Sequence, residues 1–342
     1  MVLASVHALA CALAGASFLD GPPEDAGARR EWWRLRVVPL LACIGSVGTE
    51  LSRGQVDVVM LLAVAAGIYW ATRRRELWAG MALAVPAAIK LFPPVILLLP
   101  AWRRRWRMFG GVFMGLALTW VLVPWAALGT GRTLELYRTW FEVLARPSLG
   151  QGNDASRARE LTNMNATDNQ SLLNVIHNMA HRSVPRAQRP PRASDGARLA
   201  VNITGAALLL ACAWVAGVRR EDSPVQFMLV AGLWVAMALV VSPVVHGFYY
   251  IMAIPLLAAL VFLAGRPRPP CPPWVSAAVV VGFGVVDLVT RFPGIGPFLR
   301  ERGATLFSLA VLMILSGWNL RRISGRAIPS LVRPARESGP PA

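Results

Sequence analysis

Apolar runs long enough to cross a bilayer recur along the whole chain, and short polar segments separate them. A transmembrane helix needs about 20 consecutive, mostly apolar residues. The hydropathy pattern predicts about nine crossings, at residues 2–19, 37–52, 55–72, 108–128, 199–218, 226–242, 245–265, 273–290 and 303–320. We therefore expect an all-α multi-pass membrane protein, with one transmembrane domain over residues 1–328.

One further apolar stretch, residues 76–107, differs from the others. It contains the only lysine of the chain, Lys90, several prolines and an arginine cluster at each end. Prolines in mid-span free backbone groups that protein or a water-filled cavity must satisfy. A single crossing would place one arginine cluster outside, against the positive-inside rule. We therefore expect a re-entrant hairpin over residues 78–101, broken between Lys90 and Pro94. A single kinked span is the alternative.

Arginine-rich loops set the expected orientation, because short loops of this kind stay on the cytoplasmic side. Arg219 and Arg220 are predicted inside, and the arginines of residues 291–302 outside. Residues 129–197 form a long external loop, in which Leu134 to Leu144 has the amphipathic pattern of an interfacial helix. The Pro- and Arg-rich residues 329–342 are expected to form a disordered cytoplasmic tail.

Composition and charge exclude several function classes. The 342 residues carry a formal net charge of +17, mostly in short loops between crossings. There the charge orients the protein and attracts anionic lipid, so nucleic acid is not an expected partner. The four cysteines lack metal-site spacing, and the chain has no Ser-His-Asp arrangement and no phosphate-binding glycine loop. We expect no cofactor, and no ligand cluster suggests a metal.

Several polar groups collect on the predicted external side. They are Arg53, Gln55, Asn169, Gln170, His246 and Tyr249. Most also have a purely structural interpretation. Gln55 could cap a helix, and Asn169 could cap a helix that begins at Ser171. His246 and Tyr249 could anchor the membrane interface.

Lys90 is the candidate at greater depth. A charge near the bilayer centre is costly, so it normally faces a polar cavity or a partner of opposite charge. Lys90 could bind a substrate anion in such a cavity. The structural alternative is an ion pair with a carboxylate inside the membrane, either Asp57 or Asp287.

Four short motifs follow one another in an order that is similar to that of a known family. They are Gly54-Gln55, Ala88-Ile89-Lys90-Leu91-Phe92-Pro93, Asn169-Gln170-Ser171-Leu172, and Ser242-Pro243 with His246 and Tyr249. On these motifs the chain resembles glycosyltransferase family 87 over residues 40–265. The resemblance implies a C-type glycosyltransferase fold, in which membrane helices surround a cavity at the external leaflet.

The resemblance also implies an activity. Such enzymes transfer a sugar, usually mannose or arabinofuranose, from a polyprenyl-phosphate donor to a glycolipid or glycan acceptor. We therefore expect a mannosyltransferase-like enzyme of a bacterial plasma (inner) membrane, with membrane lipids, the lipid-linked sugar and the acceptor as partners. Its cations, Lys90 and Arg53, would bind the donor phosphate. The substrate-binding candidates are Gln55, Asn169, Gln170, His246 and Tyr249.

The chain departs from the family pattern in one respect. Enzymes of this fold carry a general-base aspartate in the first external loop, after the first transmembrane helix. In the predicted topology residues 2–19 run from outside to inside, so that helix and loop have no counterpart. This favours a truncated or inactive form, or a base taken from another external carboxylate, such as Asp168 beside Asn169.

Two other function classes remain open at this point. A lipid or solute transporter, or a flippase, would use Lys90 in a midplane substrate site. Such proteins are often built from repeats with paired broken helices, whereas this sequence shows one break and no repeat. The third class is a non-catalytic membrane scaffold.

Overall fold

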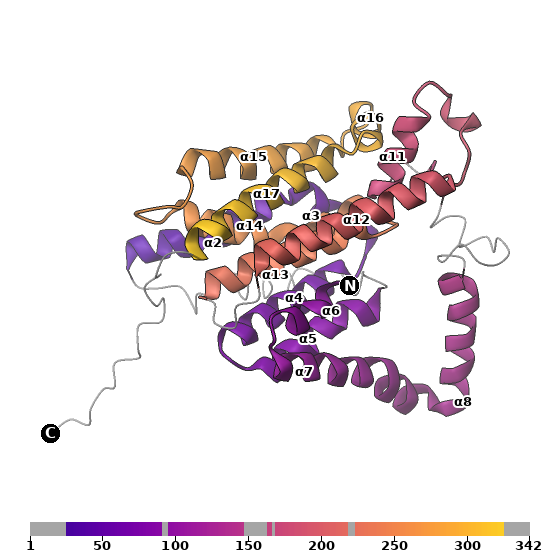
Figure 1. The fold of residues 1–342 in the computed structure, drawn as a ribbon, viewed down its shortest axis with the longest axis horizontal. Coiled ribbons are helices and arrows are strands. Elements are labelled where there is room, and N and C mark those ends of the chain that lie inside the picture. Colours follow the sequence, from indigo (N-terminus) through magenta and orange to yellow (C-terminus); the bar gives the residue numbers. More distant parts are fainter. Residues whose placement is uncertain (1–24, 91–94, 147–162, 166–167, 218–222, 325–342) are drawn as a thin grey trace.

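The described part of the chain consists of helices joined by loops (Figure 1). The computed structural model describes residues 25–90, 95–146, 163–165, 168–217 and 223–324. The α-helices are α2 (Ala26–Ala42), α3 (Ile44–Arg53), α4 (Asp57–Thr72), α5 (Glu76–Ile89), α6 (Val95–Trp102), α7 (Trp106–Ala117), α8 (Val123–Trp140), α11 (Leu172–Ala180), α12 (Asp195–Ala216), α13 (Pro224–Val241), α14 (Ile254–Ala264), α15 (Pro273–Val289), α16 (Ile295–Glu301) and α17 (Ala304–Ser324). Two π-helical segments, η1 (Leu118–Leu122) and η2 (Phe141–Ala145), and two 3-10 segments, η3 (Arg186–Gln188) and η4 (Gly247–Ala253), complete them. No strand occurs among these residues, so the expected all-α class is confirmed.

The lengths of the helices agree with a membrane protein. Within the described residues, 5 helices are long and apolar enough to cross a bilayer. The count becomes 6 if α2 and α3, which meet at a bend of 68°, form one broken span. Helices α4, α5 and α15 are apolar but shorter. The expectation of nine crossings stays a prediction, and its first span, residues 2–19, lies outside the described residues.

Helix α13 forms the centre of the bundle. It is apolar on every face and buried along nearly its whole length, as expected for a helix enclosed by other helices. A capping box begins it: Ser223 Oγ accepts the N–H of Gln226, and Gln226 Oε1 accepts the N–H of Ser223 at 2.8 Å. Figure 1 shows α13 between α17 and the α4–α6 group, and α17, α4 and α6 pack against it.

The path of the chain around Lys90 agrees with a hairpin. Helix α5 ends at Ile89, Lys90 is extended, and α6 begins at Val95. Close glycine contacts show that α5 and α7 run in the same direction. Gly111 lies against Leu77 near the start of α5, and Gly115 lies against Met81 one turn later. Since α7 begins beside the start of α5, the intervening α6 must run back along it. The side of the membrane on which both ends lie stays a prediction.

The expected interfacial helix, Leu134 to Leu144, lies in the second part of α8 and in η2. At Gly129 (φ 74°, ψ 166°) the chain bends, a conformation that favours glycine. Figure 1 shows the part beyond the bend standing away from the bundle. The ring of Tyr137 stacks on Trp120, at a centroid distance of 6.2 Å. The proposed tail, residues 329–342, lies outside the described residues.

Candidate functional site

Two loop segments that are distant in sequence join at the centre of the candidate site. Asn169 and His246 form an isolated antiparallel bridge. The N–H of Gln170 donates to the carbonyl of Val245 at 2.6 Å, and Asn169 Oδ1 accepts the N–H of Val245 at 3.1 Å. Asn169 therefore holds the two segments in register. The helix cap itself is Ser171, whose Oγ accepts a backbone N–H in the first turn of α11.

Lys90 lies beside this junction, against Tyr249. Its Nζ is 2.9 Å and 2.8 Å from the two carboxylate oxygens of Asp57, and that carboxylate is 1% exposed. The ammonium also lies over the ring of Tyr249, 4.4 Å from the centroid, and 5.1 Å from the ring centroid of Phe248. The structural alternative for Lys90, an ion pair with Asp57, is thus present. Asp287 has a different partner, Arg291.

Glu50 is a component of the site that sequence reasoning missed. Its side chain is fully buried, and Oε1 accepts the N–H groups of Asp57 at 2.7 Å and Val58 at 3.3 Å. A carboxylate at this place satisfies backbone donors at the start of α4 and is favoured by the helix dipole. The available signal was an acidic residue near the end of a predicted apolar span.

Arg53 and Asp168 form an ion pair at the outer side. Their side-chain atoms are 2.8 Å apart, and the side chains are 45% and 39% exposed. Burial alone would raise the pKa of Asp168, but the hydrogen bond and charge of Arg53 lower it below its usual value. Asp168 is therefore ionised at pH 7.

The polar groups surround a cavity of about 240 Å³. Its lining residues are Thr49, Ser52, Arg53, Asp168, Gln170, Gly247, Phe248, Arg291 and Arg300. Gln170 is fully buried, and neither its Oε1 nor its Nε2 has a hydrogen-bond partner. A Cβ added at Gly247 would lie 2.8 Å from Gln170 Nε2 and closer still to Arg291 Nη1. Only glycine at this position leaves room for the amide and the guanidinium to approach one another.

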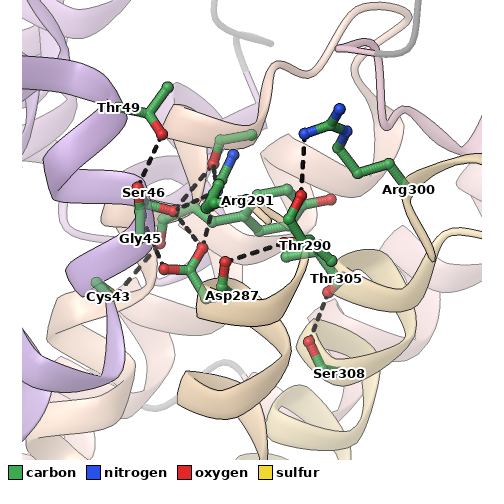
Figure 2. A network of polar contacts seen from close by, with 12 residues as sticks. Cys43, Gly45, Ser46, Thr49, Asp287, Thr290, Arg291, Arg300, Thr305 and Ser308 are labelled. Atoms are coloured by element: carbon green, nitrogen blue, oxygen red, sulfur yellow. Dashed lines mark hydrogen bonds and ion pairs between the residues drawn. The ribbon is translucent and has the colours of Figure 1, made fainter. Parts of the chain in front are cut away.

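A second network holds the far wall of this cavity (Figure 2). Asp287 accepts the N–H and the hydroxyl of Ser46, at 2.8 Å and 2.6 Å. Arg291 Nη2 donates to the same carboxylate at 2.9 Å and to the carbonyl of Gly247 at 2.8 Å. Arg300 Nη1 donates to the carbonyl of Thr290 at 2.9 Å. These bonds fix two guanidinium groups beside the cavity.

Most of the residues predicted from sequence do meet in space. Lys90 and Arg53 lie 5.1 Å and 5.8 Å from the ring centroid of Phe248. Gln55 lies in the turn between α3 and α4 and does not line the cavity. No group of three or more His, Cys, Asp or Glu side chains in the described part of the chain is placed to hold a metal ion.

Comparison with known proteins identifies the family. The model of glycosyltransferase family 87 matches residues 1–243. The chain belongs to glycosyltransferase family 87. The resemblance stated from the motifs is thereby confirmed, and with its apolar helices the chain is a multi-pass membrane glycosyltransferase. The comparisons with curated proteins and with solved structures gave no match.

The family 87 match divides the site. It includes Arg53, Lys90 and Gln170, and it ends at residue 243, before His246. The matched region therefore leaves out four cavity residues: Gly247 and Phe248 of η4, Arg291 after α15, and Arg300 of α16. In the sequence, the arginines of residues 291–302 indicated only the external side, because no local pattern shows that their side chains converge with the other cavity residues.

Proposed function

We propose that the protein transfers a sugar, mannose, from a polyprenyl-phosphate donor to a glycolipid or glycan acceptor at the external face of a bacterial plasma membrane. Membership of family 87 supports glycosyl transfer. The observation that carries the finer proposal is the junction of Lys90, Arg53 and Gln170 around Phe248. It combines cations suited to a phosphate with amide groups suited to sugar hydroxyls.

The donor's chemistry fits this arrangement. Its lipid chain would remain in the bilayer, while its phosphate and sugar reach the interface. Transfer leaves negative charge on the departing phosphate, and fixed cations stabilise that charge. We assign this stabilisation of the departing phosphate to Lys90 and Arg53. Because Asp57 offsets part of the charge of Lys90, the phosphate would experience the combined electric field of the Lys90–Asp57 ion pair.

The sugar contacts are assigned to the amide and ring side chains. Asn169 already uses its Oδ1 to accept two backbone N–H groups. Gln170 has both amide atoms without partners and is the stronger hydroxyl-binding candidate. His246 and Tyr249, whose ring centroids are 5.7 Å apart, are proposed to line the path of the sugar. Asp168 is the one carboxylate among the cavity-lining residues and remains the candidate general base.

The test is a transfer assay with purified protein in vesicles. Radiolabelled mannosyl-phosphoryl-polyprenol and its arabinofuranosyl counterpart are the donors, and extracted membrane glycolipids the acceptors. We expect transfer from the mannosyl donor, and a loss of about tenfold or more in Gln170→Leu, the effect of about 1.4 kcal/mol in the transition state. Gln188→Leu, an exposed glutamine in η3, is the matched control.

Each result decides the proposal. Transfer from the arabinofuranosyl donor alone would replace the sugar. Movement of the labelled lipid across the bilayer without transfer would overturn the enzyme assignment in favour of transport. Equal activities of the two glutamine variants would remove Gln170 from the site.

A further inference from the structure

The arginine cavity provides a site that the sequence motifs did not assign. We propose that the cavity lined by Arg53, Arg291, Arg300 and Gln170 binds a phosphate group carried by a membrane lipid. The identity of that lipid as the sugar donor rests on the proposed function, whereas the anion site itself does not.

The positive charges around the cavity outnumber the negative ones. Arg53 pairs with Asp168 at 2.8 Å, and Arg291 pairs with Asp287 at 2.9 Å. Arg300 donates to the carbonyl of Thr290, and no carboxylate in the described residues pairs with it. Three guanidinium groups thus face two carboxylates, which leaves one positive charge uncompensated. A phosphate diester carries one negative charge and would balance it.

The amide group of Gln170 also lacks hydrogen-bond partners. Burying a polar group without a hydrogen bond costs about 1–3 kcal/mol, so buried amides are nearly always paired. Gln170 is fully buried, yet its Oε1 and Nε2 have no partner. Its Nε2 is a donor that a phosphate oxygen accepts. Gly247 keeps the space between this amide and Arg291 open.

The electrostatic environment of Arg300 agrees with this arrangement. Burial lowers the pKa of Arg300, the charge of Asp168 raises it, and the charges of Arg291 and Arg53 lower it, so that the net direction is downward. The guanidinium therefore sits where an added negative charge is favourable. Arginine also matches the geometry of phosphate, because its planar donors can form two parallel hydrogen bonds.

Lys90 is a less favourable position for the anion than the arginine cavity. Asp57 holds the ammonium through both carboxylate oxygens, and the buried Glu50 lies beside that pair. An anion placed there would meet two carboxylates and one ammonium. The cavity lined by Phe248 offers three guanidinium groups instead. Two of these, Arg291 and Arg300, lie beyond the residues that the family model matches.

The test measures binding without turnover. Purified protein in neutral-lipid nanodiscs is titrated with a short-chain polyprenyl phosphate, with phosphatidylglycerol and with inorganic phosphate, and binding is followed by native mass spectrometry. We expect Arg300→Gln to weaken polyprenyl phosphate binding about tenfold or more, the loss of one charge-assisted hydrogen bond. Arg302→Gln is the control, because this exposed arginine packs on Phe298 and does not line the cavity.

The outcomes separate this proposal from the proposed function. Equal binding by the Arg300 and Arg302 variants, or no binding of any probe to the wild type, overturns the anion site. Arg300-dependent binding of polyprenyl phosphate alone supports the donor as ligand, and equal binding of phosphatidylglycerol supports a phospholipid headgroup. Binding without sugar transfer from any donor keeps the anion site and rejects the proposed function. Sugar transfer by the wild type, together with equal polyprenyl phosphate binding by the Arg300 and Arg302 variants, keeps the proposed function and rejects the anion site.

Discussion

At the scale of residues, the site combines paired charges with buried polar atoms that lack a hydrogen-bond partner, including both amide atoms of Gln170. Lys90 is matched by Asp57, Arg53 by Asp168 and Arg291 by Asp287. Pairing of this kind makes buried charge tolerable, because removing one partner leaves the other unsatisfied. A structural role and a functional role of each charge can therefore be separated only by changing both partners.

Lys90 and Asp57 provide the first such test. We expect Lys90→Met to destabilise the protein by up to about 3 kcal/mol, because the buried Asp57 carboxylate loses its cation. The double variant Lys90→Met/Asp57→Asn should recover most of that stability, since the Asp57 charge is removed together with its cation. Thermal unfolding in detergent measures both effects.

Activity of the same variants distinguishes the two roles of Lys90. If the lysine stabilises the leaving phosphate, sugar transfer stays low in the double variant although the protein is folded. Restored transfer in the double variant would show that Lys90 is only the structural partner of Asp57.

At the scale of elements, glycines set how closely the helices approach. Helices α5 and α7 pack in parallel through Gly80, Gly111 and Gly115. A Cβ at Gly115 would lie 2.7 Å from the carbonyl oxygen of Met81, where backbone cannot move aside easily. This contact joins α5, which ends beside Lys90, to α7.

The glycine contact gives a second prediction. We expect Gly115→Ala to lower the free energy of unfolding by about 1–3 kcal/mol, the cost of overpacking a close interface. Gly110→Ala in the same helix is the matched control, because nothing lies within 4 Å of a Cβ there. Comparable melting temperatures for the two variants would show that α5 and α7 do not pack as described.

At the scale of the whole molecule, the path through α5, α6 and α7 determines the topology. Helix α7 begins beside the start of α5, so the chain reverses direction between them. The arginines that flank this segment then lie at one end of the bundle. Trp102 also lies there, and its Nε1 donates to the carbonyl of Ala213 near the end of α12.

Sidedness is the prediction that belongs to this scale. In a variant without the four native cysteines, Trp78→Cys and Trp102→Cys should both react with a membrane-impermeant maleimide from the cytoplasmic side only, since a re-entrant hairpin returns both ends to one face. Ser52→Cys, predicted at the external face, serves as the reference for the opposite side. Labelling of Trp78→Cys and Trp102→Cys from different sides would contradict the hairpin.

Sequence alone determined the class of the fold and the family. Apolar runs specify membrane helices because no other local structure satisfies the backbone in lipid. The order of short motifs around Gln55, Lys90, Gln170 and His246 was enough to indicate glycosyltransferase family 87, which the family match confirms. The sequence also identified Asp57 as a possible partner of Lys90, because both charges fall in apolar segments.

Only the tertiary structure decided which side chains meet. Asp57 and Lys90 are 33 positions apart, and Ser46 and Arg291 are 245 apart. Periodicity and composition report which face of a helix is buried, but they do not report which helix covers it. Arg291 and Arg300 therefore had no signal of their own, and Glu50 showed only as an acidic residue near the end of an apolar span. Gln170 became a distinct candidate once its amide was found buried without a partner. The choice between Asp57 and Asp287 as partner of Lys90 depended on the same packing, because an ion pair needs contact at about 3 Å and sequence does not specify such distances.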